Sequence, residues 1–472
     1  MKRPLLVLQR FSLSIRYTPH RVNSWLAMLL EKHSPKGTIA ALDGVRAIAC
    51  LTVMGYHISL MTRDMHLWQV GWNPFLSAIL LAGGAGVTLF FVLSGFLLFL
   101  PYVKALLFEQ SWPSARQFYM RRALRIIPGY YFSLVLIVLL AQPDYLEPQH
   151  WGDLLLFVFF LMDATQSTFR QLNGPYWTLA IEWQFYLLLP LIALGIGCVA
   201  RRVRPEWRLW AVIGCLLGMA GWGVFTRAWG DYFTANPTAT FLIPRGMLNA
   251  ILFITYGTSG KYLEDFAVGM LVGLLYLVLR SPAVRAAYAH WMRKSSPWLW
   301  SSGILLLLYM AMQHYSHDYY YVWPVLPALF QLPNWLAELG FSLGFGCCIL
   351  AVLFGSARLK WLFEWAPLRW IGVISYSLYI WHLLLLSSFM HNIGPSLNIL
   401  PAFLAYSLYW VWAALIVVPF SCAGYLLIER PGMRLSERLR NRMLAQQRKE
   451  QAIQAQSEGS PELLRRAFWG SG

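Results

Sequence analysis

The stretch from Ala40 to His57 reads AALDGVRAIACLTVMGYH, an apolar run that contains Asp43, Arg46 and His57. On an α-helix Arg46 and His57 point almost the same way, because eleven steps of about 100° leave them roughly 20° apart and about 16 Å along the axis. Ionisable groups inside apolar helices are costly and commonly functional. Arginine keeps its proton, whereas imidazole accepts one near neutrality. We therefore treat Arg46 as a fixed charge and His57 as a candidate base. The alternative is an arginine that extends to the helix end and a structurally bonded histidine.

The composition around this stretch is that of an integral membrane protein. The chain has 472 residues, of which 58% are hydrophobic and 12% are charged, and its mean hydropathy is +0.50. Soluble domains carry about twice that share of charge. The net charge is +17, and the basic residues lie between the apolar runs, where membrane topology explains them. We therefore expect no nucleic-acid partner. The six cysteines lie in apolar runs without metal-ligand spacing, so we expect no metal site.

The apolar runs predict an all-α, polytopic membrane helix bundle. A spanning helix needs about 20 apolar residues. Ten runs fit this length, at residues 40–61, 84–103, 126–142, 176–199, 208–226, 263–279, 297–313, 336–355, 370–388 and 402–428. A further run, 154–162, is too short to span and is expected to be re-entrant, interfacial or half of a tilted helix.

The basic residues predict the orientation. With ten spans, 32 of the 38 Lys and Arg residues fall on one side, which is therefore expected to be cytoplasmic and to hold both termini. Counting 154–162 as an eleventh span would move Arg201, Arg202 and Arg204 outside, against the same rule. The predicted domains are an N-terminal cytoplasmic segment at 1–39, a transmembrane domain at 40–429 and a cytoplasmic tail at 430–472.

Glu182 is predicted to lie near His57. It stands in the fourth predicted helix, about 9 Å below its outer edge, at a depth similar to that of His57. A carboxylate beside an imidazole fixes its tautomer and stabilises its protonated form. The alternative is a structural ion pair between Glu182 and an arginine.

Two further groups of polar residues are candidates for binding. Arg121, Arg122 and Arg125 precede the third predicted helix, where they either hold a polyphosphate or serve only as the positive-inside signal. In the ninth predicted helix a polar stripe at i, i+4 and i+7 indicates either a wet cavity or hydrogen bonds between helices. This stripe consists of Ser375, Tyr379 and His382.

Together these stretches resemble the acyltransferase type 3 family of multi-spanning membrane O-acyltransferases, over about residues 40–431. The matching motifs are LDGVRA (42–47) with His57, LFFVLSGF (89–96), RRALRIIP (121–128), residues 177–186, SYSLYIWH (375–382) and IERP (428–431). The resemblance implies about ten helices and transfer of an acyl group, commonly acetyl, from cytoplasmic coenzyme A to hydroxyls of carbohydrates or glycosylated small molecules. It implies catalytic roles for Arg46 and His57 and a donor-binding role for Arg122 and Arg125.

On this resemblance His57 is either a general base or a transient acyl carrier that Glu182 orients, and Arg46 stabilises the oxyanion or binds the donor.

The chain has Thr88 where many relatives have Asp before the LFF run. From the resemblance, we expect the extracytoplasmic hydrolase-like domain of some relatives to be absent from these 472 residues. The rival hypothesis is a transporter or flippase of an anionic amphiphile that uses Arg46 and His57 as substrate and proton sites. Membrane lipid is an expected partner, and the sequence gives no oligomeric state.

Overall fold

The computed structural model describes residues 39–64, 74–318 and 332–457, and every regular element in these ranges is helical. This confirms the all-α prediction for the described part. The predicted N-terminal segment and the end of the tail lie outside it. The longer helices are α2 (Ala40–Asp64), α4 (Gly86–Leu107), α5 (Ala115–Leu140), α7 (Tyr176–Arg202), α8 (Arg208–Ala235), α10 (Leu263–Arg280), α11 (Pro282–Asp318), α12 (Asn334–Phe354), α15 (Ser375–Asn392) and α18 (Arg430–Ser457). The shorter ones are α3 (Pro74–Leu81), α6 (Trp151–Val158), α9 (Arg245–Thr255), α13 (Ala357–Glu364), α14 (Ala366–Val373), α16 (Ala402–Trp412) and α17 (Val418–Gly424).

Seven helical segments in the described residues are long and apolar enough to cross a bilayer, or eight when one bent pair is counted as a span. The seven are Ala40–Arg63, Pro74–Leu107, Ala115–Leu140, Tyr176–Arg202, Pro205–Ala235, Trp335–Phe354 and Ala402–Met443. The protein is therefore a multi-pass membrane protein. Helices α10 and α11 form over the predicted runs 263–279 and 297–313 but are not among the seven. The count of ten spans and the side of the termini remain predictions.

Helix α10 carries two acidic residues in its first turn, and one oxygen of each carboxylate has a polar partner on another helix. Arg227 of α8 donates to Glu264 Oε1 through Nε at 2.8 Å and forms an ion pair through Nη2 at 2.6 Å. Ser342 of α12 donates to Asp265 Oδ1 at 2.5 Å. Because an unpaired charge is hardly tolerated in a membrane protein interior, these contacts allow α10 to pack inside the bundle.

The predicted ninth span, 370–388, is two helices rather than one. Helices α14 and α15 meet at Ile374 with a bend of 77°. Gly372 of α14 lies directly against the backbone carbonyl of Asp43, where a Cβ atom would overlap it. This close approach lets α14 cross the start of α2 while α15 runs along it. Hydropathy sums over both pieces and so cannot detect the break.

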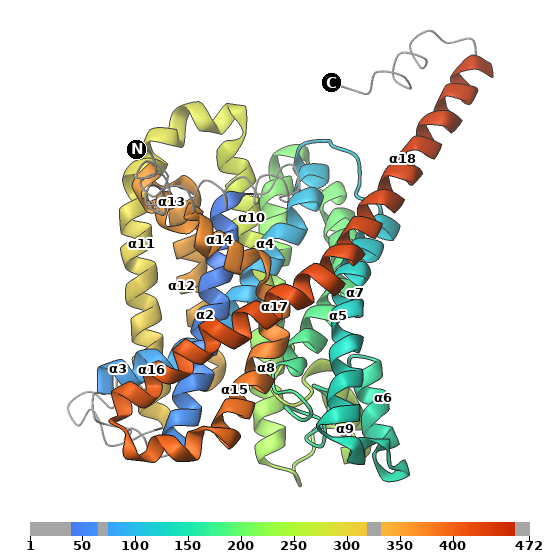
Figure 1. The fold of residues 1–472 in the computed structure, drawn as a ribbon. Coiled ribbons are helices and arrows are strands. Elements are labelled where there is room, and N and C mark those ends of the chain that lie inside the picture. Colours follow the sequence, from blue (N-terminus) through green and yellow to red (C-terminus); the bar gives the residue numbers. More distant parts are fainter. Residues whose placement is uncertain (1–38, 65–73, 319–331, 458–472) are drawn as a thin grey trace, which may run out of the picture.

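Helix α2 lies inside the bundle, packed against α4, α13, α14 and α15, whereas α18 runs obliquely and extends beyond it (Figure 1). The predicted tail at 430–472 is helical from Arg430 to Ser457, and the chain remains helical from Ala402 across the predicted boundary at residue 430. Helix α5 begins at Ala115, earlier than predicted, so the basic cluster is part of the helix. Within the run 154–162 only residues 154–158 are helical, as the end of α6, and the eight residues of α6 are too short to cross a bilayer.

Glycines bring α4 and α10 into backbone contact. Gly95 of α4 lies against the carbonyl of Phe266, and Gly269 of α10 lies against the carbonyl of Val92. A Cβ atom at either glycine would overlap a backbone atom that cannot rotate away. Small residues of this kind allow close helix packing in membranes, where apolar burial between helices gives little driving force.

We expect Gly269→Ala to lower the midpoint of thermal unfolding of the purified protein in detergent. Overpacking of a tight contact costs about 1–3 kcal/mol, and here the helices must separate. Gly214→Ala in α8 is the matched control, because no atom lies within 4 Å of the added Cβ. The control should leave the midpoint unchanged or raise it slightly. Equal midpoints for the two variants would contradict the packing argument.

Candidate active site

A cavity of about 90 Å³ lies among α2, α4, α5, α7 and α15, and we call it the Arg46 cavity. Its charged lining residues are Arg46, Arg122, Arg125 and Glu182. Three guanidinium groups against one carboxylate suit an anionic ligand, because guanidinium binds phosphate and carboxylate oxygens through charge-assisted hydrogen bonds. Arg121, also expected here, is exposed and does not line the cavity.

Hydroxyl groups hold the carboxylate of Glu182 on the wall of this cavity. Ser94 Oγ donates to Glu182 Oε1 at 2.6 Å, and the Tyr186 hydroxyl donates to the same oxygen. The guanidinium carbon of Arg122 lies 5.7 Å from the centre of the Tyr186 ring, within cation–π range. Thr178, Glu182 and Tyr186 are four residues apart in turn and form one polar face of α7 towards the cavity.

Asp43 connects the guanidinium group of Arg46 to α14. Arg46 Nη1 lies 3.5 Å from Asp43 Oδ1, and Arg369 Nη2 of α14 lies 3.6 Å from Asp43 Oδ2. The carboxylate therefore balances part of the charge of both arginines and links the first turn of α2 to α14. This arrangement holds Arg46 at the cavity wall rather than at a free helix end.

A second cavity, of about 420 Å³, contains His57 and is called the His57 cavity. Besides tyrosines, its ionisable lining residues are His57, Arg170, His314 and Glu338. Thr88 Oγ1 donates to Glu338 Oε2 at 3.1 Å, so a carboxylate of α12 lies beside Thr88. Trp177 and Tyr262 add aromatic walls. Aromatic faces beside a few polar groups are typical of small-molecule sites.

The two cavities share Val87 and Tyr379 in their linings. Tyr379 Oη lies 2.8 Å from Thr178 Oγ1, and the hydroxyl of Thr178 donates to the carbonyl of Pro175 at 2.9 Å. Because Thr178 has a single hydroxyl hydrogen, Tyr379 is the donor in their hydrogen bond. The side chain of Tyr379 therefore lies between the two cavities in a fixed orientation.

The structure does not bring His57 and Glu182 together as predicted. Glu182 lines the Arg46 cavity, and its bonded partners are Ser94 and Tyr186, whereas His57 lines the other cavity. The nearest ring recorded for His57 on another helix is that of His382, with the ring centroids 5.2 Å apart. Helix rise gives the depth of a residue but not the direction in which its face is turned, and this explains the difference.

The residues of the predicted polar stripe of α15 do not all line the same cavity. Ser375 lines the Arg46 cavity, Tyr379 lines both cavities, and His382 lines neither. His382 is buried, with 1% of its surface exposed, and lies against the rings of His57 and Tyr379. His382 therefore contacts two residues that line the cavities, His57 and Tyr379, without lining a cavity itself.

Comparison with known proteins gives the family. The model of the acyltransferase type 3 family, described as an acyltransferase domain, matches residues 39–426. The chain belongs to this acyltransferase family. The match covers every helix that contributes to the Arg46 and His57 cavities. The comparisons give no support to the transporter hypothesis.

Two bacterial relatives carry informative names. "Putative peptidoglycan O-acetyltransferase YrhL" of Bacillus subtilis is 28% identical over 371 residues, which are 75% of this chain and 50% of the relative. "Peptidoglycan O-acetyltransferase OatA" of Listeria monocytogenes is 27% identical over 360 residues, 73% of this chain and 49% of the relative. The chain thus spans about half the length of these relatives. A search of the solved structures gave no significant match.

The polar lining residues that the sequence did not single out include Glu338, Ser94 and Arg170. Glu338 is the single acidic residue of the predicted span 336–355, and its position inside an apolar run was a sufficient signal. Ser94 lies in a run of small residues that packing alone explained. Arg170 lies outside the regular helices and gave no signal beyond its charge.

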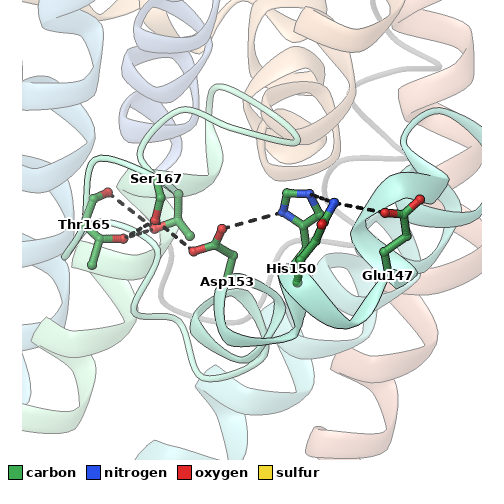
Figure 2. A network of polar contacts seen from close by, with 7 residues as sticks. Glu147, His150, Asp153, Thr165 and Ser167 are labelled. Atoms are coloured by element: carbon green, nitrogen blue, oxygen red, sulfur yellow. Dashed lines mark hydrogen bonds and ion pairs between the residues drawn. The ribbon is translucent and has the colours of Figure 1, made fainter.

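Polar residues also gather on and beside α6, outside both cavities (Figure 2). Ser167 Oγ donates to Asp153 Oδ1 at 2.8 Å, and His150 Nδ1 lies 3.9 Å from Asp153 Oδ2. In a Ser-His-Asp triad the histidine lies between the other two. Here the aspartate lies between the serine and the histidine, so no imidazole is placed to take the proton of Ser167. This network is structural.

Proposed function

We propose that the protein is a membrane O-acyltransferase that moves an acyl group, acetyl in the first instance, from coenzyme A to a carbohydrate hydroxyl. The observation that carries this proposal is the pair of cavities that share Val87 and Tyr379. One is rich in guanidinium groups and the other contains an imidazole, so a donor and an acceptor have separate places. The names of the relatives support acetyl as the group and a glycan as the acceptor.

The Arg46 cavity fits the reactive end of an acyl-CoA. At about 90 Å³ it is far smaller than a nucleotide site, but has room for several water molecules and hence for a small acyl group. Arg122 and Arg125, which line the same cavity, would hold the donor through charge-assisted hydrogen bonds. Arg46, held by Asp43, would stabilise the negative charge that develops on the thioester oxygen.

His57 would act on the acceptor. A hydroxyl group in the His57 cavity gives its proton to the imidazole, and its oxygen attacks the acyl carbonyl carbon. The C–S bond breaks, an ester forms, and the departing thiolate takes a proton to give free coenzyme A. Tyr379, which lies between the cavities, marks the place where the two reactants meet.

The cell membrane of a bacterium is the proposed location, with the donor on the cytoplasmic side. The concentration of Lys and Arg on one predicted side supports this orientation. With this orientation we propose a cytoplasmic segment at 1–39, a transmembrane domain at 40–429 and a cytoplasmic tail at 430–472. In this orientation α5 brings Arg122 and Arg125 to the donor side.

The decisive experiment uses the purified protein in detergent with acetyl-CoA and a soluble N-acetylglucosamine oligosaccharide. We expect release of free thiol that depends on the protein, and an acetyl-sized increase in the mass of the oligosaccharide. A transporter would release no thiol, because transport does not break the thioester C–S bond. Absence of both signals with acetyl-CoA and with longer acyl-CoA donors would contradict the proposed function.

A further inference from the structure

The imidazole rings of His57 and His382 lie side by side. His57 is on α2 and His382 is on α15, and their ring planes are inclined at 44° with the centroids 5.2 Å apart. His57 lines its cavity, whereas His382 is almost completely buried and lines neither cavity. The second imidazole is thus placed to act on the first, and not on a ligand.

Hydrogen bonds to the backbone fix the tautomer of His382. Its Nδ1 lies 2.8 Å from the carbonyl oxygen of Tyr379 and 3.2 Å from that of Leu378. Carbonyl oxygens only accept, so Nδ1 carries the hydrogen and Nε2 of the neutral ring carries a lone pair. This Nε2 is buried and has no hydrogen-bond partner among the described residues. Buried polar atoms are seldom left unpaired without a functional reason.

We propose that His382 is the positioning residue for His57: a rotation of the His57 imidazole would bring its N–H to Nε2 of His382, which has no hydrogen-bond partner in the described part of the chain. This proposal rests on the proposed function in which His57 is the base. The contact would hold one tautomer of His57 and leave the lone pair of its other nitrogen to the cavity. When His57 takes the proton of a hydroxyl, its N–H becomes a charged donor and the bond to His382 strengthens.

The arrangement gives His382 the role that the sequence assigned to Glu182. The carboxylate of Glu182 is already bound by Ser94 and Tyr186 at the other cavity. A neutral His382 as the acceptor also avoids placing a second positive charge beside His57. Arg170 lines the same cavity as His57, and two adjacent imidazolium groups would repel each other. The pair is therefore suited to hold one proton at a time.

Replacement of His382 by Asn or by Gln distinguishes the roles of its two ring nitrogens. His382→Asn keeps a donor near the position of Nδ1 but is too short to reach His57. His382→Gln places an acceptor near the position of Nε2. His391→Asn is the matched control, because His391 is on the same helix, its Nδ1 lies 2.8 Å from the Ser387 carbonyl oxygen, and it is exposed.

The test measures the rate at which diethyl pyrocarbonate modifies His57 in the purified protein, followed by mass spectrometry, together with kcat and KM for transfer. Loss of one hydrogen bond to a charged group corresponds to about a tenfold change. His382→Asn should slow modification of His57 and lower kcat by about that factor with KM for acetyl-CoA unchanged. His382→Gln should restore most of both, and His391→Asn should match the wild type.

A purely structural His382 would behave differently. Asn and Gln would then lower the unfolding midpoint and leave the modification rate of folded protein unchanged, which would overturn the proposal. Normal modification and normal kcat in His382→Asn would overturn it as well. The proposed function is tested separately, since slow modification of His57 without an effect on transfer would support the contact and count against His57 as the base.

Discussion

Replacement of His57 by Ala is expected to reduce acyl transfer by about 10²–10⁴-fold, the range that a positioned general base contributes. Ala removes the imidazole that lines the 420 Å³ cavity and adds no group that could block it. The measurement is the initial rate of ester formation on the oligosaccharide at saturating acetyl-CoA. Binding of coenzyme A should be unaffected, because His57 does not line the Arg46 cavity.

His57→Gln and His391→Ala complete this experiment. Gln keeps hydrogen-bonding capacity at position 57 but cannot accept a proton near neutrality, so it should be as inactive as Ala. His391 is exposed on α15, and its replacement should leave the rate unchanged. Full activity of His57→Ala in folded, membrane-inserted protein would remove His57 from the mechanism.

Replacement of Arg122 or Arg125 by Ala is expected to raise KM for acetyl-CoA by about 10- to 100-fold. Each guanidinium group lines the Arg46 cavity, and a hydrogen bond to a charged group contributes about 1.5–3 kcal/mol, which corresponds to this range. Lys keeps the charge but loses the planar pair of donors, so Arg125→Lys should recover only part of the affinity. Titration of coenzyme A into the purified variants measures the same loss directly.

Two other arginines serve as comparisons. Arg121 is on the same helix but exposed, and an exposed charge is screened by solvent, so Arg121→Ala should raise KM by about threefold or less. Arg201, exposed at the end of α7, lines neither cavity and should have no effect. Equal losses for Arg122, Arg125 and Arg201 would show that general positive charge, and not a donor site, sets the affinity.

Much of the helical framework was predictable because hydropathy acts over the length of a helix. The runs at 40–61 and 176–199 correspond closely to α2 and α7. The run at 370–388 was predicted as one continuous helix, whereas the structure divides it at Ile374, next to the close contact between Gly372 and the backbone of Asp43. Contacts of that kind join residues far apart in the chain and leave no periodic signal.

The chemistry of the site divides in the same way. The amino-acid sequence was enough to place Arg46 and His57 on one side of a helix, since helical periodicity is a local property. It also determined that the third predicted helix begins among basic residues. The neighbours of Arg46 and His57 became known from the packing of the helices: Glu182 faces the Arg46 cavity, and His382 contacts His57. Depth along a helix follows from residue number, whereas the direction of a side chain follows from how the helices are rotated against one another, and packing between distant segments sets that rotation.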